Sequence, residues 1–236
     1  MKRFSQQPVV ALTGAGISAE SGVPTFRGDE GLWRDHNPQE LATATAFHRD
    51  PELVWAWYAW RRELIAACRP NAAHKTLAAM ERELEDFTLV TQNVDGLHQA
   101  AGSQRVLELH GNIWRLRCTR CDYRTEDHSV PLPNLPPCCP ACDALLRPDV
   151  VWFGESLPRQ VLDAAWRAVV DCQTMLVVGT SALVEPAASL PLLALRNKSR
   201  LVEINPSETP LSEHAHQVLR QPAGEALPRW WSAFKK

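Results

Sequence analysis

The sequence has almost no net charge and no apolar run that approaches the length needed to cross a membrane. Its 25 Lys and Arg residues and 27 Asp and Glu residues give a net charge of -2 over 236 residues. This balance supplies no global field for nucleic acid or a membrane surface, although it does not exclude a local basic patch. Signs of repeats or disorder are absent too, so the 45% hydrophobic content indicates an ordinary soluble globular protein.

The amino terminus shows no leader pattern, and the cysteines are not spread as in a disulfide framework. The opening M-K-R-F-S runs directly into the first apolar segment, which leaves no room for a signal or transit peptide. The seven cysteines include two C-x-x-C pairs, which fit a reduced compartment and a metal better than disulfides. We therefore expect a cytoplasmic protein.

A short apolar run and a glycine turn open the chain. The run from Pro8 to Leu12 predicts a buried parallel strand, and it ends in T-G-A-G. Gly14, Gly16 and Ala19 fit the looser dinucleotide fingerprint, in which phosphate binds at the start of the next helix. A plain turn between strand and helix explains the glycines equally well, so both interpretations stay open at this point.

The polar loop that follows resembles a cofactor lid more than a connector, because it carries Phe26 and Arg27 between glycines. The full stretch from Gly14 to Gly28 reads G-A-G-I-S-A-E-S-G-V-P-T-F-R-G. It resembles the signature of the sirtuins, the NAD-dependent protein lysine deacylases. Further motifs follow in the order of that family, from about Val10 to Leu227.

Two predicted strands end on polar side chains that suit catalysis. The strand from Phe87 to Thr91 leads into Q-N-V-D, and the strand that begins at Val106 ends on L-E-L-H-G. Asn93 and Asp95 could equally cap the next helix, and most of the eight histidines are expected to be structural. The sirtuin resemblance implies that Asn93 and Asp95 hold the ribose and the carboxamide of nicotinamide, and that His110 is the catalytic base.

A helix predicted from Pro51 to Cys68 carries aromatic residues around most of its circumference, so we expect it to be buried on more than one side. Tyr58 and Arg61 lie three residues apart on one face. Spacing alone favours a packing tyrosine and a solvated arginine. The resemblance to the desuccinylase and demalonylase branch of the sirtuins implies instead that this pair reads an acyl carboxylate, and that Ala42 leaves room for a longer acyl chain.

The pairs Cys118/Cys121 and Cys139/Cys142 have a separation close to the about 15–20 residues of a four-thiolate zinc site. Four protein ligands fill the coordination sphere, so we predict a structural zinc ion. Cys138 could replace Cys139 by a register slip, but Cys139 restores the two-residue knuckle. Four arginines around the first knuckle permit nucleic-acid contact, although we expect them to form an ordinary solvent-exposed surface.

The run from Arg147 to Glu155 is extended and apolar, and we expect it to return to the main sheet. In the sirtuins the V-x-F-G-E part is an edge to which the substrate peptide adds a strand. The matching residues are Val151, Trp152, Phe153 and Gly154. On periodicity alone an ordinary core strand fits as well.

The last third alternates helices and strands, which predicts a parallel, doubly wound sheet. We expect helices at 159–171 and 187–195, strands at 174–178, 200–204 and 216–219, and a final helix. Two strand ends, G-T-S at Gly179 and N-P-S at Asn205, resemble family motifs for the adenosine half of NAD. The resemblance assigns cofactor contacts to Gly14, Ala15, Gly16, Ile17, Ser18, Ala19, Glu20, Pro24, Thr25, Phe26, Arg27, Trp33, Gln92, Asn93, Val94, Asp95, Gly179, Thr180, Ser181, Asn205, Pro206, Ser207 and Ala223.

The fold implied is α/β, a Rossmann-like doubly wound parallel sheet with a smaller helical and zinc-binding domain. The large domain would comprise residues 1–34, 86–112 and 149–236, and the small domain a helical module at 35–85 and a zinc module at 113–148. The implied activity removes acetyl, and succinyl or malonyl, groups from lysine and yields nicotinamide, O-acyl-ADP-ribose and free lysine. An NAD-dependent ADP-ribosyltransferase and a zinc-ribbon nucleic-acid binder remain as alternatives.

Overall fold

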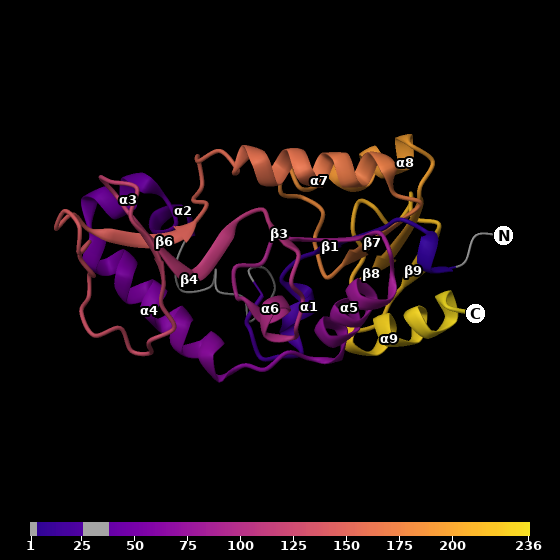
Figure 1. Ribbon diagram of the computed structural model, residues 1–236, viewed down its shortest axis with the longest axis horizontal. Helices are drawn as coiled ribbons and strands as arrows, with labels where there is room; N and C mark the ends of the chain where they lie inside the picture. Colours follow the sequence, from indigo (N-terminus) through magenta and orange to yellow (C-terminus); the bar gives the residue numbers. More distant parts are fainter. Residues whose placement is uncertain (1–3, 26–37) are drawn as a thin grey trace.

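Apolar runs separated by amphipathic helices fold into one six-stranded parallel sheet, which confirms the predicted doubly wound arrangement (Figure 1). The computed structural model describes residues 4–25 and 38–236. The strand order is β3-β2-β1-β7-β8-β9. The strands are β1 (Val9–Thr13), β2 (Phe87–Thr91), β3 (Val106–Glu108), β7 (Thr174–Val178), β8 (Arg200–Ile204) and β9 (Gln217–Leu219).

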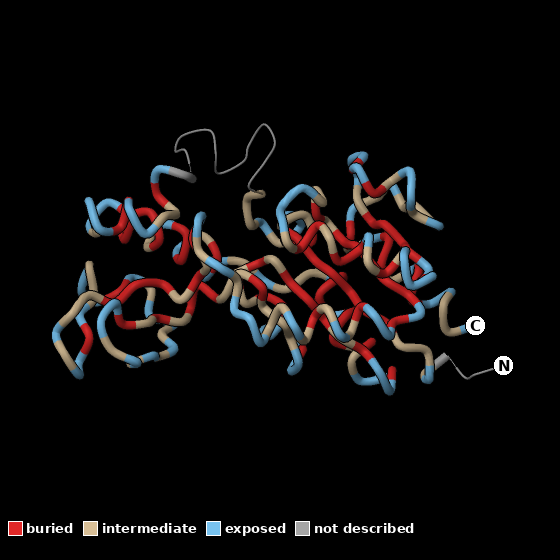
Figure 2. Tube along the Cα trace, turned by 90° about the horizontal axis from the view of Figure 1, so that it is seen from above, coloured by how far each residue is buried: buried red, intermediate tan, exposed pale blue. Residues whose placement is uncertain are grey.

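Helices cover both faces of this sheet. In β1, Val9 and Ala11 face a core shared with α5 (Ala72–Glu83) and α9 (Ala223–Phe234). The alternate residues, Val10 and Leu12, face a second core. That core is shared with α7 (Arg159–Asp171) and α8 (Ser189–Arg196). Burial on both faces explains why the central strands β1 and β7 are largely apolar rather than alternating. Buried segments run through the interior of the molecule in Figure 2.

Side-chain caps fix where two of the helices begin. The carboxylate of Asp50 accepts a hydrogen bond from the Leu53 N–H (2.9 Å), and Pro51 opens α4 (Pro51–Ala67). The side-chain oxygen of Asn71 accepts the Ala73 N–H (2.9 Å) at the start of α5. α4 lies within one residue of its predicted bounds.

The smaller part of the molecule has its own core and its own sheet, which lie at the left of Figure 1. Here α4 packs with α2 (Pro38–Leu41) and α3 (Ala44–Arg49). Beside them lies an antiparallel sheet of order β5-β4-β6. Its strands are β4 (Gly111–Cys118), β5 (Arg124–Glu126) and β6 (Leu146–Val150).

The run from Arg147 to Glu155 does not return to the main sheet, so that expectation was wrong. Its strand β6 pairs with β4, for example Cys118 with Leu146 and Gly111 with Val150. The chain between the two cysteine pairs folds back on itself, and this places the strand after the second pair beside the strand before the first. Beyond β6 the segment makes one isolated bridge, between Phe153 and Thr43.

The aromatic residues of α4 do not all enter the core. Trp55, Trp57 and Tyr58 are buried, but Trp60 is 45% exposed and shares the solvent face with Leu53, seven residues earlier. One side of α4 therefore stays exposed to solvent although the helix carries aromatic residues there too.

The packing of α5 bears on the division of the chain into domains. Ala73, Leu77 and Met80 belong to the core of the large sheet, together with β1 and α9. We therefore propose that the helical module ends near residue 70 and that α5 belongs to the large domain.

Among residues 4–25 and 38–236, no helix is both long and apolar enough to cross a membrane.

Candidate functional site

Loops that follow five parallel strands, β1, β2, β3, β7 and β8, meet at one edge of the large sheet. The strand order reverses direction between β1 and β7, and such a switch point is where open α/β sheets bind ligands at the carboxyl ends of their strands. The Gly14 N–H donates to the Val178 carbonyl (3.0 Å), and the Gly16 N–H donates to the Gly179 carbonyl (2.7 Å). The turns after β1 and β7 are thereby joined.

Glycine is required where these two turns touch. A Cβ atom on Gly14 would lie 2.7 Å from the Thr180 Cβ, and one on Gly16 would lie 2.8 Å from the Gly179 Cα. Gly179 itself has a φ of 63°. The glycines of the fingerprint therefore serve close contact between two loops, and α1 (Gly16–Ala19) begins directly at this contact.

A buried hydrogen-bond network lies beneath the turn. The Ser18 hydroxyl donates to the Asp95 carboxylate (2.7 Å), and the Asn93 amide donates to the Ser18 oxygen and to the Gly14 carbonyl (3.1 Å each). His74 Nε2 lies 3.4 Å from the same Ser18 oxygen. The network thus joins two predicted catalytic residues to Ser18 and to His74, which the sequence analysis did not single out.

Asp95 also binds the start of the next helix, whose N-cap residue is Gly96. Its second carboxylate oxygen accepts the Leu97 N–H (2.9 Å) at α6 (Leu97–Ala100). Burial raises the pKa of Asp95, and the bonds from Leu97 and Ser18 oppose that shift.

The side-chain oxygen of Asn93, unlike the carboxylate of Asp95, receives no donor from the part of the chain that the structure describes. That oxygen is the atom with which Asn93 could meet a ligand.

His110 follows β3 and has one nitrogen already engaged. Its Nδ1 lies 2.9 Å from the Gln92 carbonyl oxygen, which can only accept, so Nδ1 carries the proton. The lone pair therefore lies on Nε2. Burial lowers the pKa of His110, and the Gln92 carbonyl opposes that shift. The imidazole is neutral at pH 7 and has the form that a general base requires.

The loops after β7 and β8 are joined through Thr180. The Gln92 amide donates to the Thr180 hydroxyl (2.9 Å), and the Asn205 amide donates to the Thr180 carbonyl (2.9 Å). The Asn205 oxygen accepts the Ser207 N–H (3.1 Å). The predicted adenosine-side residues Thr180, Asn205 and Ser207 are therefore contiguous, with Pro206 and Ser207 exposed.

Some predicted cofactor residues lie elsewhere. Ile17 is fully buried in the core under the sheet, and Val94 packs against the core of the small module. Glu20 accepts the Gly224 N–H (2.6 Å), which joins α1 to the first turn of α9 beside Ala223. Phe26, Arg27 and Trp33 lie outside the described residues. Ala15, Ala19, Pro24, Thr25 and Ser181 are within them and lie along the same turns.

Tyr58 and Arg61 are both buried on α4, with exposed fractions of 1% and 6%. Burial raises the pKa of Tyr58, and the charge of Arg61 opposes that shift. Burial also lowers the pKa of Arg61, against the favourable charge of Asp95. Tyr58 is a packing residue of the small core, as the spacing suggested, whereas Arg61 is a buried guanidinium that feels the charge of Asp95 and is not solvated.

The predicted peptide edge is partly occupied within the chain. Its backbone N–H groups donate from Val151 to His110 O, from Trp152 to Glu155 Oε2 and from Phe153 to Ala42 O, each at 2.9 Å. Among the described residues, the Gly154 N–H meets no acceptor. Phe153 is 47% exposed, whereas Trp152 is 2% exposed and belongs to the small core.

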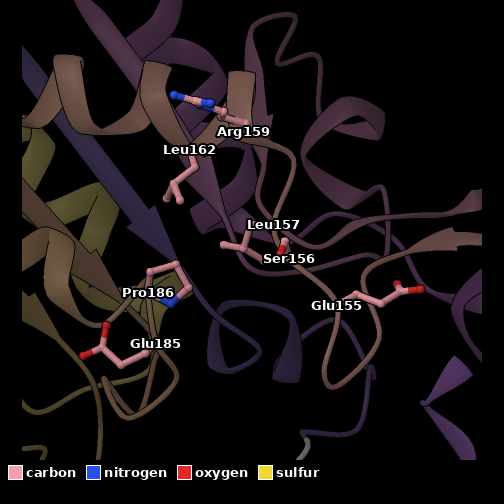
Figure 3. Close-up of a pocket in the computed structure, with 7 residues that line it drawn as sticks. All are labelled: Glu155, Ser156, Leu157, Arg159, Leu162, Glu185 and Pro186. Carbon is pink, nitrogen blue, oxygen red and sulfur yellow. The ribbon is translucent and has the colours of Figure 1, made fainter. Parts of the chain in front are cut away.

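A hollow of about 440 Å³ opens just beyond this edge, between the start of α7 and the loop before α8 (Figure 3). Leu157, Leu162 and Pro186 lie toward its middle, and Glu155 extends away from them. Leu183 and Val184, next to this loop, are 54% and 37% exposed. The sequence analysis missed them, because an apolar pair after a strand usually indicates core.

The four predicted zinc ligands come together. The Sγ atoms of Cys118 and Cys142 lie 3.5 Å apart, those of Cys121 and Cys139 lie 3.6 Å apart, and all four lie within 4.8 Å of one another. Thiolates about 2.3 Å from a tetrahedral zinc ion are about 3.8 Å apart. The four cysteines are therefore positioned to bind a zinc ion.

Cys138 is exposed and is not part of this cluster. The arginines near the first knuckle are largely neutralised. Arg124 contacts the Asp149 carboxylate at 2.6 Å, and Arg117 lies 3.5 Å from Asp149 and 3.4 Å from Glu155.

Comparison with known proteins agrees with this geometry. The Sir2 family model matches residues 14–186. The chain belongs to the Sir2 family. It is 52% identical, over 97% of its length and 95% of the relative, to an NAD-dependent protein deacylase of Aquifex aeolicus (strain VF5). A mutant Sir2 homologue in complex with ADP-ribose has a TM-score of 0.93 and 49% identity, with 98% of this chain and 93% of that chain covered.

A more distant Sir2 structure, a complex with a p53 peptide and NAD+, has a TM-score of 0.83 and 34% identity, and covers 96% of this chain and 92% of that chain. The Sir2 match includes the glycine turn, His110 and all four clustered cysteines. Asn205 and Ala223 lie beyond the matched residues.

Proposed function

We propose that this Sir2 protein is an NAD-dependent protein lysine deacylase. The observation that carries the proposal is His110, whose Nδ1–H is held by the Gln92 carbonyl at 2.9 Å and whose Nε2 lone pair is left for proton transfer. It comes from the same sheet edge as Asn93 and Asp95. Relatives that are 52% to 53% identical to this chain are named NAD-dependent protein deacylases.

The residues at the switch point fit a dinucleotide. The turn from Gly14 to α1 suits the phosphates, and Asn205 and Ser207 supply polar groups for the adenosine half. Asn93 Oδ1 would accept from a hydroxyl or an amide. When bound, NAD supplies a ribose carbon whose bond to nicotinamide is labile. The chain chiefly orients this group, while Asn93 and Ser18 hold one another in place.

His110 acts by moving one proton. Its Nδ1–H is fixed on a backbone carbonyl, which sets the tautomer, and Nε2 accepts the proton of a hydroxyl brought to it. Burial lowers the pKa of His110, so the ring is in its basic form at neutral pH. The zinc ion would have no part in this chemistry, because four thiolates leave no open coordination position.

We further propose that the enzyme accepts acidic acyl groups, such as succinyl and malonyl, beside acetyl. Arg61 is a buried cation on the same helix face as Tyr58, and a guanidinium can bind a carboxylate through charge-assisted hydrogen bonds. The small side chain of Ala42 lies one residue before the bridge between Thr43 and Phe153, beside the predicted peptide edge.

Acylated lysine peptides are the proposed substrates. Because three amides of the 151–154 segment already donate within the chain, a peptide strand would pair from Gly154 onward, toward the hollow next to Leu157 and Pro186. A solved Sir2 structure holds a peptide and NAD+ together.

The seven unpaired cysteines support a reducing, cytoplasmic location.

The test follows the masses of the products from an acetyl-lysine peptide incubated with NAD. We expect the peptide to lose its acetyl group and nicotinamide to appear in equal amount. H110A is expected to bind NAD by calorimetry yet to lack turnover. Near-normal turnover in H110A would refute the base assignment, and a peptide that gains ADP-ribose while keeping its acetyl group would indicate a transferase.

A further inference from the structure

Trp152, which belongs to the predicted peptide edge, contacts Tyr58, one of the two residues predicted to bind an acyl carboxylate. The indole Nε1–H of Trp152 donates to the Tyr58 hydroxyl oxygen at 2.9 Å, across 94 residues of sequence. Both side chains are buried, at 2% and 1% exposure. The bond therefore ties the segment after β6 to the middle of α4 inside a dry core.

The indole ring is held on several sides. The Arg147 guanidinium lies over its face, 3.2 Å from the ring centroid, and the Phe47 ring centroid lies 5.2 Å away. The backbone N–H of Trp152 donates to Glu155 (2.9 Å), and Glu155 is paired with Arg147 at 2.5 Å. These contacts leave the indole N–H one direction in which to point.

This donation restricts the hydroxyl of Tyr58. An indole N–H can only donate, so the phenol oxygen must accept. A phenol hydrogen prefers to lie in the plane of its ring, which gives it two favoured orientations, and a donor on one side disfavours that orientation. No acceptor for the Tyr58 hydrogen is found within residues 4–25 and 38–236. The hydrogen is therefore directed away from Trp152, where an acceptor that reaches this buried hydroxyl would meet it.

We propose that Trp152 is a positioning residue for acyl selectivity, because its bond to Tyr58 turns the phenol hydrogen toward the carboxylate of an acidic acyl group. This inference rests on the proposed deacylase function. Trp152 would then have two roles, because its backbone lies in the predicted peptide edge and its side chain orients the hydroxyl of Tyr58.

A double-mutant cycle tests the proposal. The quantity measured is the ratio of kcat/KM for succinyl-lysine to kcat/KM for acetyl-lysine on one peptide, in the wild type, W152F, Y58F and the double variant. Replacement of Trp152 by Phe keeps an aromatic ring and removes the donor. We expect W152F to lower the ratio about 3- to 10-fold, as for one neutral hydrogen bond, and to leave it unchanged in the Y58F background.

W55F is the matched control. Trp55 is also buried in the small core, but its indole donates to the Leu146 carbonyl (2.9 Å) and not to Tyr58. We expect W55F to leave the ratio unchanged even if it lowers stability. An equal drop in W55F, or the same drop from W152F with and without the Tyr58 hydroxyl, would overturn the proposal in favour of a packing effect.

A spectroscopic measurement covers the case in which W152F fails to fold. The chain has two tyrosines, so carbon-labelled tyrosine gives two Cζ signals in the wild type. A succinyl-lysine peptide is expected to shift the Tyr58 signal more than an acetyl-lysine peptide does, and equal shifts would overturn the inference. A wild type with no succinyl activity would instead refute the acidic-acyl part of the proposed function, and the inference with it.

Discussion

The Nδ1 atom of His110 lies 2.9 Å from the backbone carbonyl oxygen of Gln92, and this contact fixes which nitrogen of the imidazole is basic. Burial lowers the pKa of His110 below its ordinary 6.5. Catalysis requires the neutral ring, so activity is lost as the pH falls through that lowered pKa. We expect the acid limb of kcat/KM to lie below pH 6.5 on a peptide with no group that titrates in this range. A limb above 6.5 would contradict the assignment.

Two buried histidines make the folded state sensitive to acid. Burial lowers the pKa of His98 to about 3, with help from the charge of His74, and burial lowers that of His74 to about 4. The unfolded chain protonates both near 6.5, so the unfolded state binds more protons between that pH and these values. The free energy of unfolding is therefore expected to decrease as the pH is lowered below 6.5, by up to about 1.4 kcal/mol per pH unit for each histidine.

Urea denaturation of the zinc-loaded protein at several pH values from 5 to 7 measures this slope. H98Q keeps a polar atom near Thr13, the partner of His98 Nε2 at 2.9 Å, and removes one titrating group. Its slope is expected to be shallower than that of the wild type, by a difference that approaches about 1.4 kcal/mol per pH unit toward the acid end of this range. Asp95, whose pKa is raised by burial, works in the opposite direction at lower pH in both proteins and cancels in the comparison. Equal slopes would show that His98 does not stay neutral.

The zinc module offers a matched pair of neighbouring cysteines. Cys139 Sγ lies 3.6 Å from Cys121 Sγ, whereas Cys138 is exposed and outside the cluster. C139S is expected to lose zinc and to lower the melting temperature, since metal binding contributes to folding free energy. C138S is expected to keep one zinc ion per chain by elemental analysis. Equal zinc loss in the two variants would reassign the ligand.

A buried carboxylate holds the loop of the predicted adenosine site. Glu203 is 1% exposed and accepts from Arg220 (3.1 Å), which also donates to the Ser207 carbonyl (3.2 Å). E203Q removes the charge that holds Arg220 in place. We expect the KM for NAD to rise about fivefold or more, with a smaller change in kcat. E208Q, at an exposed residue of the same loop, is the control, and the account fails if both variants have the wild-type KM.

Strands that are mostly apolar could be placed from sequence. The bounds of β2, β7 and β8 match the predictions to the residue, because a strand buried on both faces is built mainly from apolar residues. The four zinc ligands could be predicted as well, since two knuckles at a fixed spacing carry their own geometry.

Contacts between distant segments could not be read in the same way. Ser18 and His74 are 56 residues apart, and nothing in either stretch shows that they meet. The side chain of Trp152 enters the small core although its neighbour Phe153 is exposed, and an extended run gives no sign of which residue faces inward. The pairing of β6 with β4 depends on how the zinc module folds back, which spacing alone does not determine.

The most direct test measures kcat/KM for NAD-dependent lysine release from one peptide that bears an acetyl, malonyl, succinyl or glutaryl group, in the wild type, R61M and R69M. Arg69 is exposed near the end of the same helix and serves as the control. We predict activity on acidic acyl groups and a loss of about tenfold or more in R61M on succinyl-lysine relative to acetyl-lysine, because a buried carboxylate loses a charged partner. Equal losses on all groups would make Arg61 structural, and no release from any acyl-lysine by the wild type would contradict the deacylase account.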